Sequence, residues 1–400
     1  MQYPLSVAAC LAALLMQGIW ERLARGRALR AVPIRIHVNG TRGKSTVTRL
    51  IAGALKEAGI PAVAKTTGTA ARILLPDGSE RPVNRHAPPS IREQLWLLGQ
   101  ARRAGARAVV AECMAIRPEL QWMSERAMLS STIGVVTNVR LDHTDAMGAS
   151  LDQIAESLAN TTPESGTLVV GDRRFLSVFE RRAAGLGTTV IAAEETAEAG
   201  GAETQWEERN RAVALAVTRV LGISDPVALE GMRKARPDPG AARASTVSSM
   251  GREVRVVDAA AANDPESLDL IMAGHFASDP SGVGDRDRFQ RELSNWVAVF
   301  NHREDRPLRL RVFAEASLVI QRAGRLILTG DRPPHTLLKR VREVRGCRPV
   351  TVARRGRLAS ALGQILRTSS ESVGVVFCGN TKGLDIHTLV GEPDRPTTHG

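Results

Sequence analysis

The sequence predicts an α/β protein with mostly parallel sheets, and three observations lead to that fold class. Runs rich in β-branched residues alternate with helical patterns along most of the chain, as in a parallel sheet covered by helices on both faces. A glycine-rich turn joins the first of these runs to a helical pattern. The chain has 400 residues, 43% of them hydrophobic, which is enough for two domains.

Each predicted element follows from its own pattern. Ile34–Val38 is enriched in β-branched residues and predicts a strand, and Ser45–Ala58 has apolar residues at helical spacing. A segment rich in proline and charge, Arg233–Gly240, interrupts the alternation and indicates a domain boundary. Further strands are expected at residues 106–111, 133–137, 167–170, 254–257, 296–300, 326–329 and 373–377.

The first thirty residues have a different pattern. An uncharged and largely apolar run from Tyr3 to Trp20 is followed by several arginines. About eighteen helical residues, each rising 1.5 Å, just cross a hydrocarbon core of ~30 Å. The arginines would keep the following residues in the cytoplasm. We therefore expect a membrane-anchor or membrane-surface helix, and an ordinary core helix remains the alternative.

The composition favours an anionic partner. The net charge is +12, with 54 Lys and Arg against 42 Asp and Glu, and this surplus attracts nucleotides, acidic substrates or anionic lipid. No nucleic-acid partner is expected, because aromatic residues make up only 3% of the chain and do not interleave with the scattered arginines. An arginine-rich genome could also produce the surplus. The four cysteines are isolated, which argues against a disulfide framework or a zinc site.

The turn after the first strand has the chemistry of a phosphate-binding loop. It reads Asn39-Gly40-Thr41-Arg42-Gly43-Lys44-Ser45-Thr46. In such a turn, backbone N–H groups surround an anion at the positive end of a helix. Lys44 would reach the β- and γ-phosphates of ATP, and the hydroxyl of Ser45 would bind Mg²⁺. The usual pattern has another glycine where this chain has Val38, so the match is to a shorter variant.

Two polar clusters follow predicted strands. Glu112 closes the strand at 106–111, and His143 lies in the segment Thr137–Asp145 after the next strand. Ligand sites in open α/β sheets form outside the carboxyl ends of the strands. A carboxylate and an imidazole near the phosphates could hold a divalent ion, so Glu112 and His143 are predicted metal ligands.

Several segments together resemble one family. In chain order they are Gly40–Thr46, Glu112, Asn138 with Asp142 and His143, Asn210 before an alanine-rich helix, the Pro239-Gly240 linker, and Asp258–Ser267 with Asn263. From Ile34 to the end, this order resembles the Mur ligases and folylpolyglutamate synthetases. Within them the chain is most similar to the ligase subunit of bacterial poly-γ-glutamate (capsule) synthase. This similarity rests on the apolar N-terminus directly before the loop domain and on Lys65–Thr69, Pro89–Gln94 and Asn301–Arg309.

The resemblance implies an architecture. Residues 1–30 would form the membrane-anchor helix with its basic flank. Residues 31–236 would form a Mur-ligase-like P-loop domain that binds ATP, and residues 237–400 a smaller Rossmann-like ligase domain.

The resemblance also implies a reaction and its residues. ATP would phosphorylate the γ-carboxylate at the end of a glutamate chain, and the amine of the next glutamate would attack the acyl phosphate. Lys44, Asn138 and His143 would be catalytic. Ser45 and Glu112 would hold one ion and His143 a second, with Mg²⁺ expected and Mn²⁺ as an alternative. The nucleotide-binding set would be Asn39, Gly40, Thr41, Arg42, Gly43, Lys44, Ser45, Thr46, Asn210, Asn263, Asp305 and Arg306.

The implied partners are glutamate, the poly-γ-glutamate chain and small membrane subunits of a synthase and export complex. The catalytic domains would lie on the cytoplasmic side of the cell membrane, and a homo-oligomer remains open. In one respect the chain departs from many relatives, which carry a carbamylated lysine about fifteen residues after the Asp-His pair. Here that region is Ala155-Glu156-Ser157-Leu158, so another arrangement must position the metal.

Two other functions remain as alternatives. A soluble folylpolyglutamate-type or Mur-type ligase would act on a small molecule, but we expect no N-terminal domain for a nucleotide-sugar peptide ahead of the loop domain. A nucleotide-driven switch or transport ATPase needs only the phosphate loop, and it leaves the Asp-His cluster and the second domain unexplained.

Overall fold

The chain divides into two compact units in the computed structural model. One comprises Met1–Glu198 and Glu208–Pro239, and the other Ala199–Glu207 and Gly240–Gly400. The structure describes residues 3–67, 71–85, 88–194, 205–238, 243–249, 252–260, 262, 264–277, 286–368, 373–380 and 384.

The first unit is built on an eight-stranded sheet with the order β4-β3-β2-β5-β1-β6-β7-β8. The strands are β1 Ile34–Asn39, β2 Ala62–Lys65, β3 Arg72–Leu74, β4 Glu80–Pro82, β5 Ala108–Glu112, β6 Ile133–Val136, β7 Thr167–Val170 and β8 Thr189–Ala192. The neighbouring strands β2, β5, β1, β6, β7 and β8 pair in parallel. Strands β3 and β4 extend the sheet beyond β2 as an antiparallel edge. The parallel sheet of the predicted fold class is therefore confirmed.

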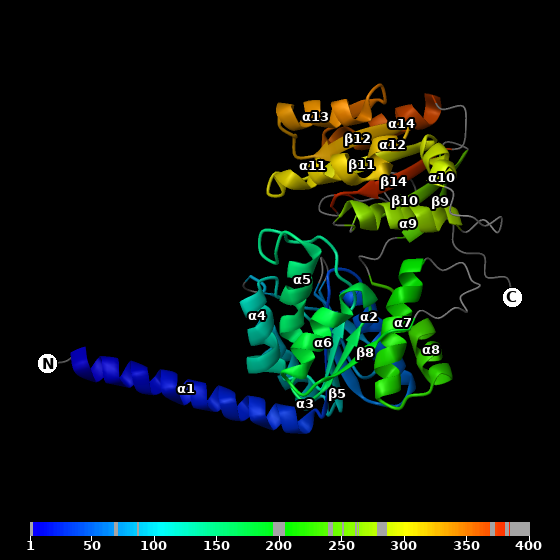
Figure 1. Ribbon diagram of the computed structural model, residues 1–400. Helices are drawn as coiled ribbons and strands as arrows, with labels where there is room; N and C mark the ends of the chain where they lie inside the picture. The colour runs from blue at the N-terminus through cyan, green and yellow to red at the C-terminus, as the bar shows by residue number, and fades with distance from the viewer. Residues whose placement is uncertain are drawn as a thin grey trace. The chain divides into compact units, whose positions relative to one another are not determined.

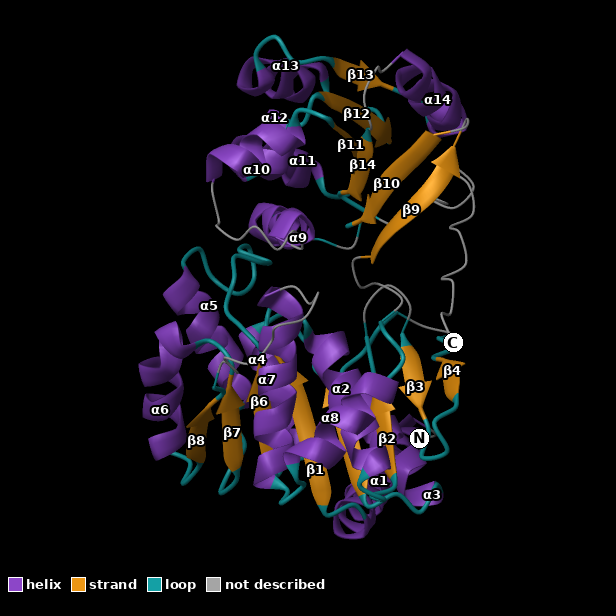
Figure 2. Cartoon of the chain, turned by 90° about the vertical axis from the view of Figure 1, so that its right-hand side faces the viewer, coloured by secondary structure: helices purple, strands orange, loops and turns teal. Residues whose placement is uncertain are grey.

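Helices cover both faces of this sheet (Figure 2). They are α2 Lys44–Glu57, α3 Glu93–Arg103, α4 Pro118–Met123, α5 Leu151–Leu158, α6 Leu176–Ala184, α7 Gln205–Val220 and α8 Asp225–Lys234, with shorter turns at Ser124–Leu129, Ala159–Thr161 and Arg173–Phe175. Val110 packs with α2, α7 and α8, whereas its neighbour Val109 packs with α3 on the opposite face. This alternation follows from the period of two along a strand, and burial on both faces explains the nearly continuous apolar runs.

The second unit has a six-stranded sheet with the order β13-β12-β11-β14-β10-β9. Its strands are β9 Arg243–Ser249, β10 Arg252–Asp258, β11 Trp296–His302, β12 Arg325–Gly330, β13 Val350–Val352 and β14 Gly374–Cys378. Its helices are α9 Pro265–Ala277, α10 Arg286–Leu293, α11 Pro307–Ala316, α12 Leu318–Arg322, α13 His335–Arg345 and α14 Leu358–Thr368, with a short turn at Arg355–Arg357. All pairs are parallel except β9 with β10. Apolar residues of α9, α11, α12 and α13 pack on one face and those of α14 on the other.

The N-terminal helix α1 spans Tyr3–Ala31 and runs away from the sheet of the first unit (Figure 1). Among the described side chains of α1, those that join the hydrophobic core lie at its end, where Ala28 and the following Val32 pack with α3. Farther back, large apolar side chains such as Leu15 (67% exposed) and Trp20 (66% exposed) lie in solvent, so this stretch is not an ordinary core helix. Within the described part of the chain, no helix has the length and apolar character needed to cross a membrane.

Candidate functional site

The phosphate loop lies between β1 and α2 and requires glycine at two positions. Gly40 and Gly43 have φ angles of 125° and 76°, which residues with a side chain rarely adopt. Space is also lacking, since a Cβ at Gly40 would lie 2.1 Å from Oγ1 of Thr137, and one at Gly43 would lie 2.3 Å from Oδ1 of Asn210. The two glycines therefore let the backbone curl closely against the neighbouring segments.

Helix α2 begins at Lys44, directly after this turn. Because no side chain caps its first turn, the first N–H groups and the positive end of the helix dipole are available to an anion. The ammonium group of Lys44 folds back over the loop and donates to the carbonyls of Gly40 (2.7 Å) and Thr41 (3.3 Å). A bound phosphate would exchange these neutral acceptors for anionic ones.

Asn138 holds the loop from the side of β6. Its Oδ1 accepts from the Thr41 hydroxyl (2.8 Å) and from the Arg42 N–H (3.0 Å), and its Nδ2 donates to the Arg42 carbonyl (3.0 Å). The Arg42 carbonyl also accepts from the Thr137 hydroxyl. The side chain that we expected beside the γ-phosphate is thus engaged in fixing the loop backbone.

Glu112 ends β5 beside the loop and is 3% exposed. One carboxylate oxygen accepts from the Ser45 hydroxyl (2.8 Å) and from the Thr67 N–H (2.7 Å), and the other accepts from the Thr67 hydroxyl (2.6 Å). Two of the predicted metal ligands therefore touch one another. The role of Thr67 was not predicted, although it lies within the Lys65–Thr69 segment that carried the family resemblance.

His143 and Asp142 lie after β6, whose carboxyl end is beside that of β1. Asp142 accepts from Nη1 of Arg42 at 2.7 Å, and Nε2 of His143 lies 3.9 Å from the other carboxylate oxygen. Burial raises the pKa of Asp142, but the Arg42 guanidinium more than offsets this and holds the pKa below its usual range. The His143 side chain is 38% exposed, so it remains accessible at the edge that carries the loop.

Asn210, in α7, lies against the loop beside Gly43. It is 2% exposed, and its Nδ2 has no hydrogen-bond partner among the residues that the structure describes. A buried donor without a partner costs free energy unless a ligand satisfies it. Together with the glycine cradle and the uncapped helix, this donor fits a phosphate group.

The side-chain amide of Asn39, a residue of the predicted nucleotide-binding set, lies in a buried network. Its Nδ2 donates to Gln121 (2.8 Å) and Thr161 (3.1 Å), both buried behind the loop. Gln121 in turn donates to the Ser157 hydroxyl at 3.1 Å. These uncharged side chains therefore occupy the region around Ser157, where the family resemblance led us to look for a carbamylated lysine.

No group of three or more His, Cys, Asp and Glu side chains that could hold a metal occurs in the described ranges. The donors at this edge are instead one carboxylate, one hydroxyl and one imidazole from Glu112, Ser45 and His143. The carboxylate and the hydroxyl suit a hard cation such as Mg²⁺, which usually takes its remaining ligands from water and substrate phosphates, whereas the imidazole is the softer ligand of the three.

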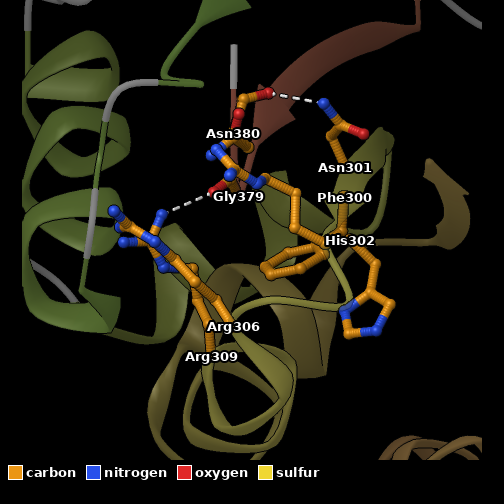
Figure 3. A pocket seen from close by; sticks show the side chains of 8 residues that line it. Phe300, Asn301, His302, Arg306, Arg309, Gly379 and Asn380 are labelled. Atoms are coloured by element: carbon orange, nitrogen blue, oxygen red, sulfur yellow. Dashed lines mark hydrogen bonds between the residues drawn. The ribbon is translucent and has the colours of Figure 1, made fainter. Parts of the chain in front are cut away.

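Two predicted residues lie in the second unit. Asp305 accepts from the Arg303 side chain (2.7 Å), while Arg306 lines a shallow depression at the start of α11 (Figure 3). Asn263 lies outside the described residues. Asp305 and Arg306 belong to the second compact unit, and the phosphate loop belongs to the first. Each part of the predicted site is therefore described by its own contacts.

Family comparisons match both parts of the chain. Residues 38–223 match the Mur ligase middle domain, and residues 244–389 match the C-terminal domain of poly-gamma-glutamate synthase CapB. The fold is similar to the bifunctional folylpolyglutamate synthase/dihydrofolate synthase of Yersinia pestis complexed with AMPPNP and a Mn ion, with a TM-score of 0.57. That likeness covers 90% of this chain and 89% of the other at 16% identity. The chain is thus an ATP-dependent ligase of the Mur type.

Two relatives define its position more closely. The chain is 36% identical to PGA synthase CapB of Bacillus subtilis over 338 residues, which cover 82% of each protein. It is 38% identical to the capsule biosynthesis protein CapB of Bacillus anthracis, over 80% of this chain and 68% of the other. This chain belongs to the CapB family of poly-γ-glutamate synthases.

Proposed function

We propose that this protein forms γ-glutamyl isopeptide bonds and elongates poly-γ-glutamate through an acyl-phosphate intermediate. The observation that carries the proposal is the contact of Glu112 with Ser45 and Thr67 at the rim of the phosphate loop. It places a buried carboxylate beside Ser45, in the first turn of the phosphate-binding helix. The names of the CapB relatives support glutamate and its polymer as substrates.

The reaction follows from charge and position. A γ-carboxylate oxygen of the chain end attacks the γ-phosphorus of ATP, and ADP leaves. The amine of the next glutamate then attacks the acyl carbon, so that an amide forms, phosphate leaves and the amine releases a proton. Lys44 and the N–H groups of the loop stabilise the negative charge that develops on the phosphoryl oxygens.

The donor set supports Mg²⁺ as the ion, with Mn²⁺ as an alternative. Ser45 and Glu112 would hold it, and His143 would contribute to a second position. A divalent ion supplies charge neutralisation on the transferring phosphoryl group. The hydrogen bonds from Thr67 restrict the Glu112 carboxylate, which fixes its direction before an ion arrives.

The test is ADP formation with Mg²⁺ and L-glutamate, D-glutamate, short poly-γ-glutamate or folates as alternative acceptors. We expect ADP release to require glutamate and to increase with the γ-linked oligomer. Release that depends on folates would favour the small-molecule ligase. Release that needs no acceptor would favour a nucleotide-driven switch or transport ATPase.

We further propose that α1 holds the protein at the cytoplasmic face of a membrane, beside small membrane subunits of an export complex. The exposed apolar side chains, which include Leu14, Leu15 and Ile19, support this proposal, and arginines follow them in the same helix. Apolar and basic groups together bind anionic lipid surfaces.

Flotation with vesicles tests the localisation. The intact chain should float with vesicles that contain anionic lipid, and a chain that begins after Trp20 should remain behind. The shortened chain keeps Ala28 and Val32, which anchor the helix end in the core, so it should retain its melting temperature. Equal flotation of both chains would contradict the proposal.

A further inference from the structure

Two short segments that carried the family resemblance meet beside Glu112. One is Lys65–Thr69 at the carboxyl end of β2, which the structure describes as far as Thr67, and the other is Pro89–Gln94, which leads into α3. Because β2 pairs with β5 in parallel, the chain that follows Lys65 runs alongside Glu112. Each segment forms hydrogen bonds with this residue.

The two segments hold different parts of Glu112. Thr67 donates to both carboxylate oxygens, from its N–H at 2.7 Å and from its hydroxyl at 2.6 Å. The fully buried side-chain amide of Gln94 donates to the backbone carbonyl of Glu112 at 3.2 Å. The direction of the carboxylate relative to β5 therefore depends on where both segments lie.

An ion pair joins the same two segments. Nζ of Lys65 lies 3.0 Å from Oε2 of Glu93, the first residue of α3. The Lys65 side chain is 0% exposed, so solvent screens the attraction between the two charges only weakly. Lys65 lies two residues before Thr67, and Glu93 lies directly before Gln94. One ionic contact thus connects the neighbours of both residues that hold Glu112.

The charge of Glu93 does not by itself require this lysine. Arg85 already donates to both carboxylate oxygens of Glu93, at 2.8 and 3.2 Å. Burial raises the pKa of Glu93, but the hydrogen bond from Arg85 and the charge of Lys65 hold the pKa below its usual range. A buried ammonium group loses its hydration, and an apolar side chain of similar size often stabilises a protein at least as well. The buried Lys65 is therefore better explained by the position it imposes than by added stability.

We propose that the Lys65–Glu93 ion pair is a positioning device that keeps the Glu112 carboxylate in the direction that holds the divalent ion. The inference rests on the proposed function, in which Glu112 is a ligand of that ion. Lys65 and Glu93 act through Thr67 and Gln94 rather than by binding metal or nucleotide themselves. Without the pair, the end of β2 and the start of α3 can move apart, and the carboxylate loses its fixed direction.

The experiment measures how much Mg²⁺ strengthens the binding of the ATP analogue AMPPNP to the full-length protein. Titration calorimetry gives the dissociation constant of AMPPNP with EDTA and with Mg²⁺, and the ratio of the two is the Mg²⁺ enhancement. Lys65→Met should lower the Mg²⁺ enhancement about three- to tenfold, less than the ~10–100-fold loss expected when a direct partner of a metal ligand is removed. The affinity for AMPPNP in EDTA should stay unchanged, because the phosphate loop is intact.

Three further variants complete the test. Glu93→Gln should also lower the Mg²⁺ enhancement, and because Glu93 is partly exposed, it tests the ion pair even if Lys65→Met does not fold. The double variant should lose no more than the more affected single variant, since the two residues act as one unit. The matched control is Arg49→Met, because the Arg49 side chain is also buried (2% exposed) and pairs with Glu80 at 2.7 Å. It should keep the wild-type enhancement, and melting curves show that each variant is folded.

Three results would overturn the proposal. One is an unchanged Mg²⁺ enhancement in both Lys65→Met and Glu93→Gln, or an equal loss in Arg49→Met. Another is a loss of AMPPNP affinity that is the same with and without Mg²⁺, which would place the effect in the phosphate loop. The third is a loss in the double variant that equals the product of the single losses, which would show that the two residues act independently.

Failure of this proposal can be told apart from failure of the proposed function. If Glu112→Gln abolishes the Mg²⁺ enhancement and Lys65→Met leaves it unchanged, only the positioning role fails. If Glu112→Gln also leaves it unchanged, Glu112 is not a metal ligand and the proposed metal site fails. A protein that shows the expected Mg²⁺ enhancements but releases no ADP with glutamate would refute the ligase reaction and leave the positioning role intact.

Discussion

The two sheets carry different chemistry at their carboxyl edges. In the first unit, Asn138 fixes the loop backbone, and Glu112 accepts hydrogen bonds from Ser45 and Thr67. In the second unit, Arg306 and Arg309 line a shallow depression at the corresponding edge, where Arg309 donates to the Gly379 carbonyl and Asn301 to the Asn380 carbonyl. A site that aligns a phosphoryl group for transfer needs a rigid geometry.

Two buried histidines, one in each sheet, have pKa shifts of opposite direction. His37 in β1 pairs with Glu125 at 2.8 Å; burial lowers its pKa, but the Cys113 sulfur and the Glu125 carboxylate raise it to about 10. His302 in β11 is also buried, and there desolvation lowers the pKa despite Asp331 and Glu304. Polar neighbours thus hold the pKa of the first imidazole high, whereas desolvation keeps the pKa of the second low.

The largest expected effect tests the phosphate loop directly. Lys44→Ala should lower the rate of glutamate-dependent ADP release by at least about 10³-fold, because the variant loses the cation that faces the transferring phosphoryl group. Lys56→Ala is the matched control, since Lys56 lies at the other end of α2 and donates to the Asp77 carbonyl. It should keep nearly full activity. Substantial turnover by Lys44→Ala would remove the loop from the mechanism.

A smaller effect tests whether the loop is held in advance. Asn138→Ala removes three hydrogen bonds to the loop, so we expect the KM for ATP to rise about tenfold and stability to fall by about 1–3 kcal/mol. The KM for glutamate should change much less. Asn160→Ala, which removes an amide that donates to helix carbonyls, is the control. If both variants raise the KM for ATP equally, Asn138 has no special role in the loop.

The buried histidines should respond to pH with opposite signs. The folded pKa of His37 is raised, so the stability from its pair is fully present below the unfolded pKa of ~6.5 and is lost as the pH rises through about 10. His37→Gln should therefore cost roughly 3–5 kcal/mol near pH 6, and less near pH 10.

His302→Gln is the matched comparison. Because the folded pKa of His302 is lowered, the wild-type protein loses stability there as the pH falls below ~6.5, and the variant avoids that loss. Chemical denaturation at several pH values measures both differences. A cost for His37→Gln that does not depend on pH would show that its contribution is packing rather than charge.

The strands with strong patterns were predictable, and the weakly patterned ones were not. Residues 167–170 form β7 as predicted, and Ile34–Val38 forms β1, which continues by one residue. In contrast, β2 was missed because Ala62–Lys65 is only four residues long and rich in alanine, which favours strands weakly. The polar edge strand β9 was missed because its neighbour β10, rather than its own residues, gives it a place in the sheet.

The candidate site divides in a similar way. The glycine, lysine and serine positions of the loop could be read from the sequence, since a phosphate cradle needs those residue types at fixed spacing. The hydrogen-bond partners of the site residues could not be predicted from the sequence. Thr67 lies 45 residues from Glu112, and Gln121 lies 82 residues from Asn39, and no local pattern specifies which distant side chains will meet.

The sequence by itself determined the α/β class, the phosphate loop and the resemblance to Mur-type ligases, because each depends on residue types at short range. Tertiary structure decided which side chains stabilise the loop. Asn138 forms hydrogen bonds with the loop residues Thr41 and Arg42, and the Asn39 side chain lies in a buried network. It also gathered Arg306 and Arg309 with Gly379, some 70 residues onward, around one depression. Those arrangements arise when parallel strands bring their carboxyl ends to one edge, which joins residues that are far apart in the chain.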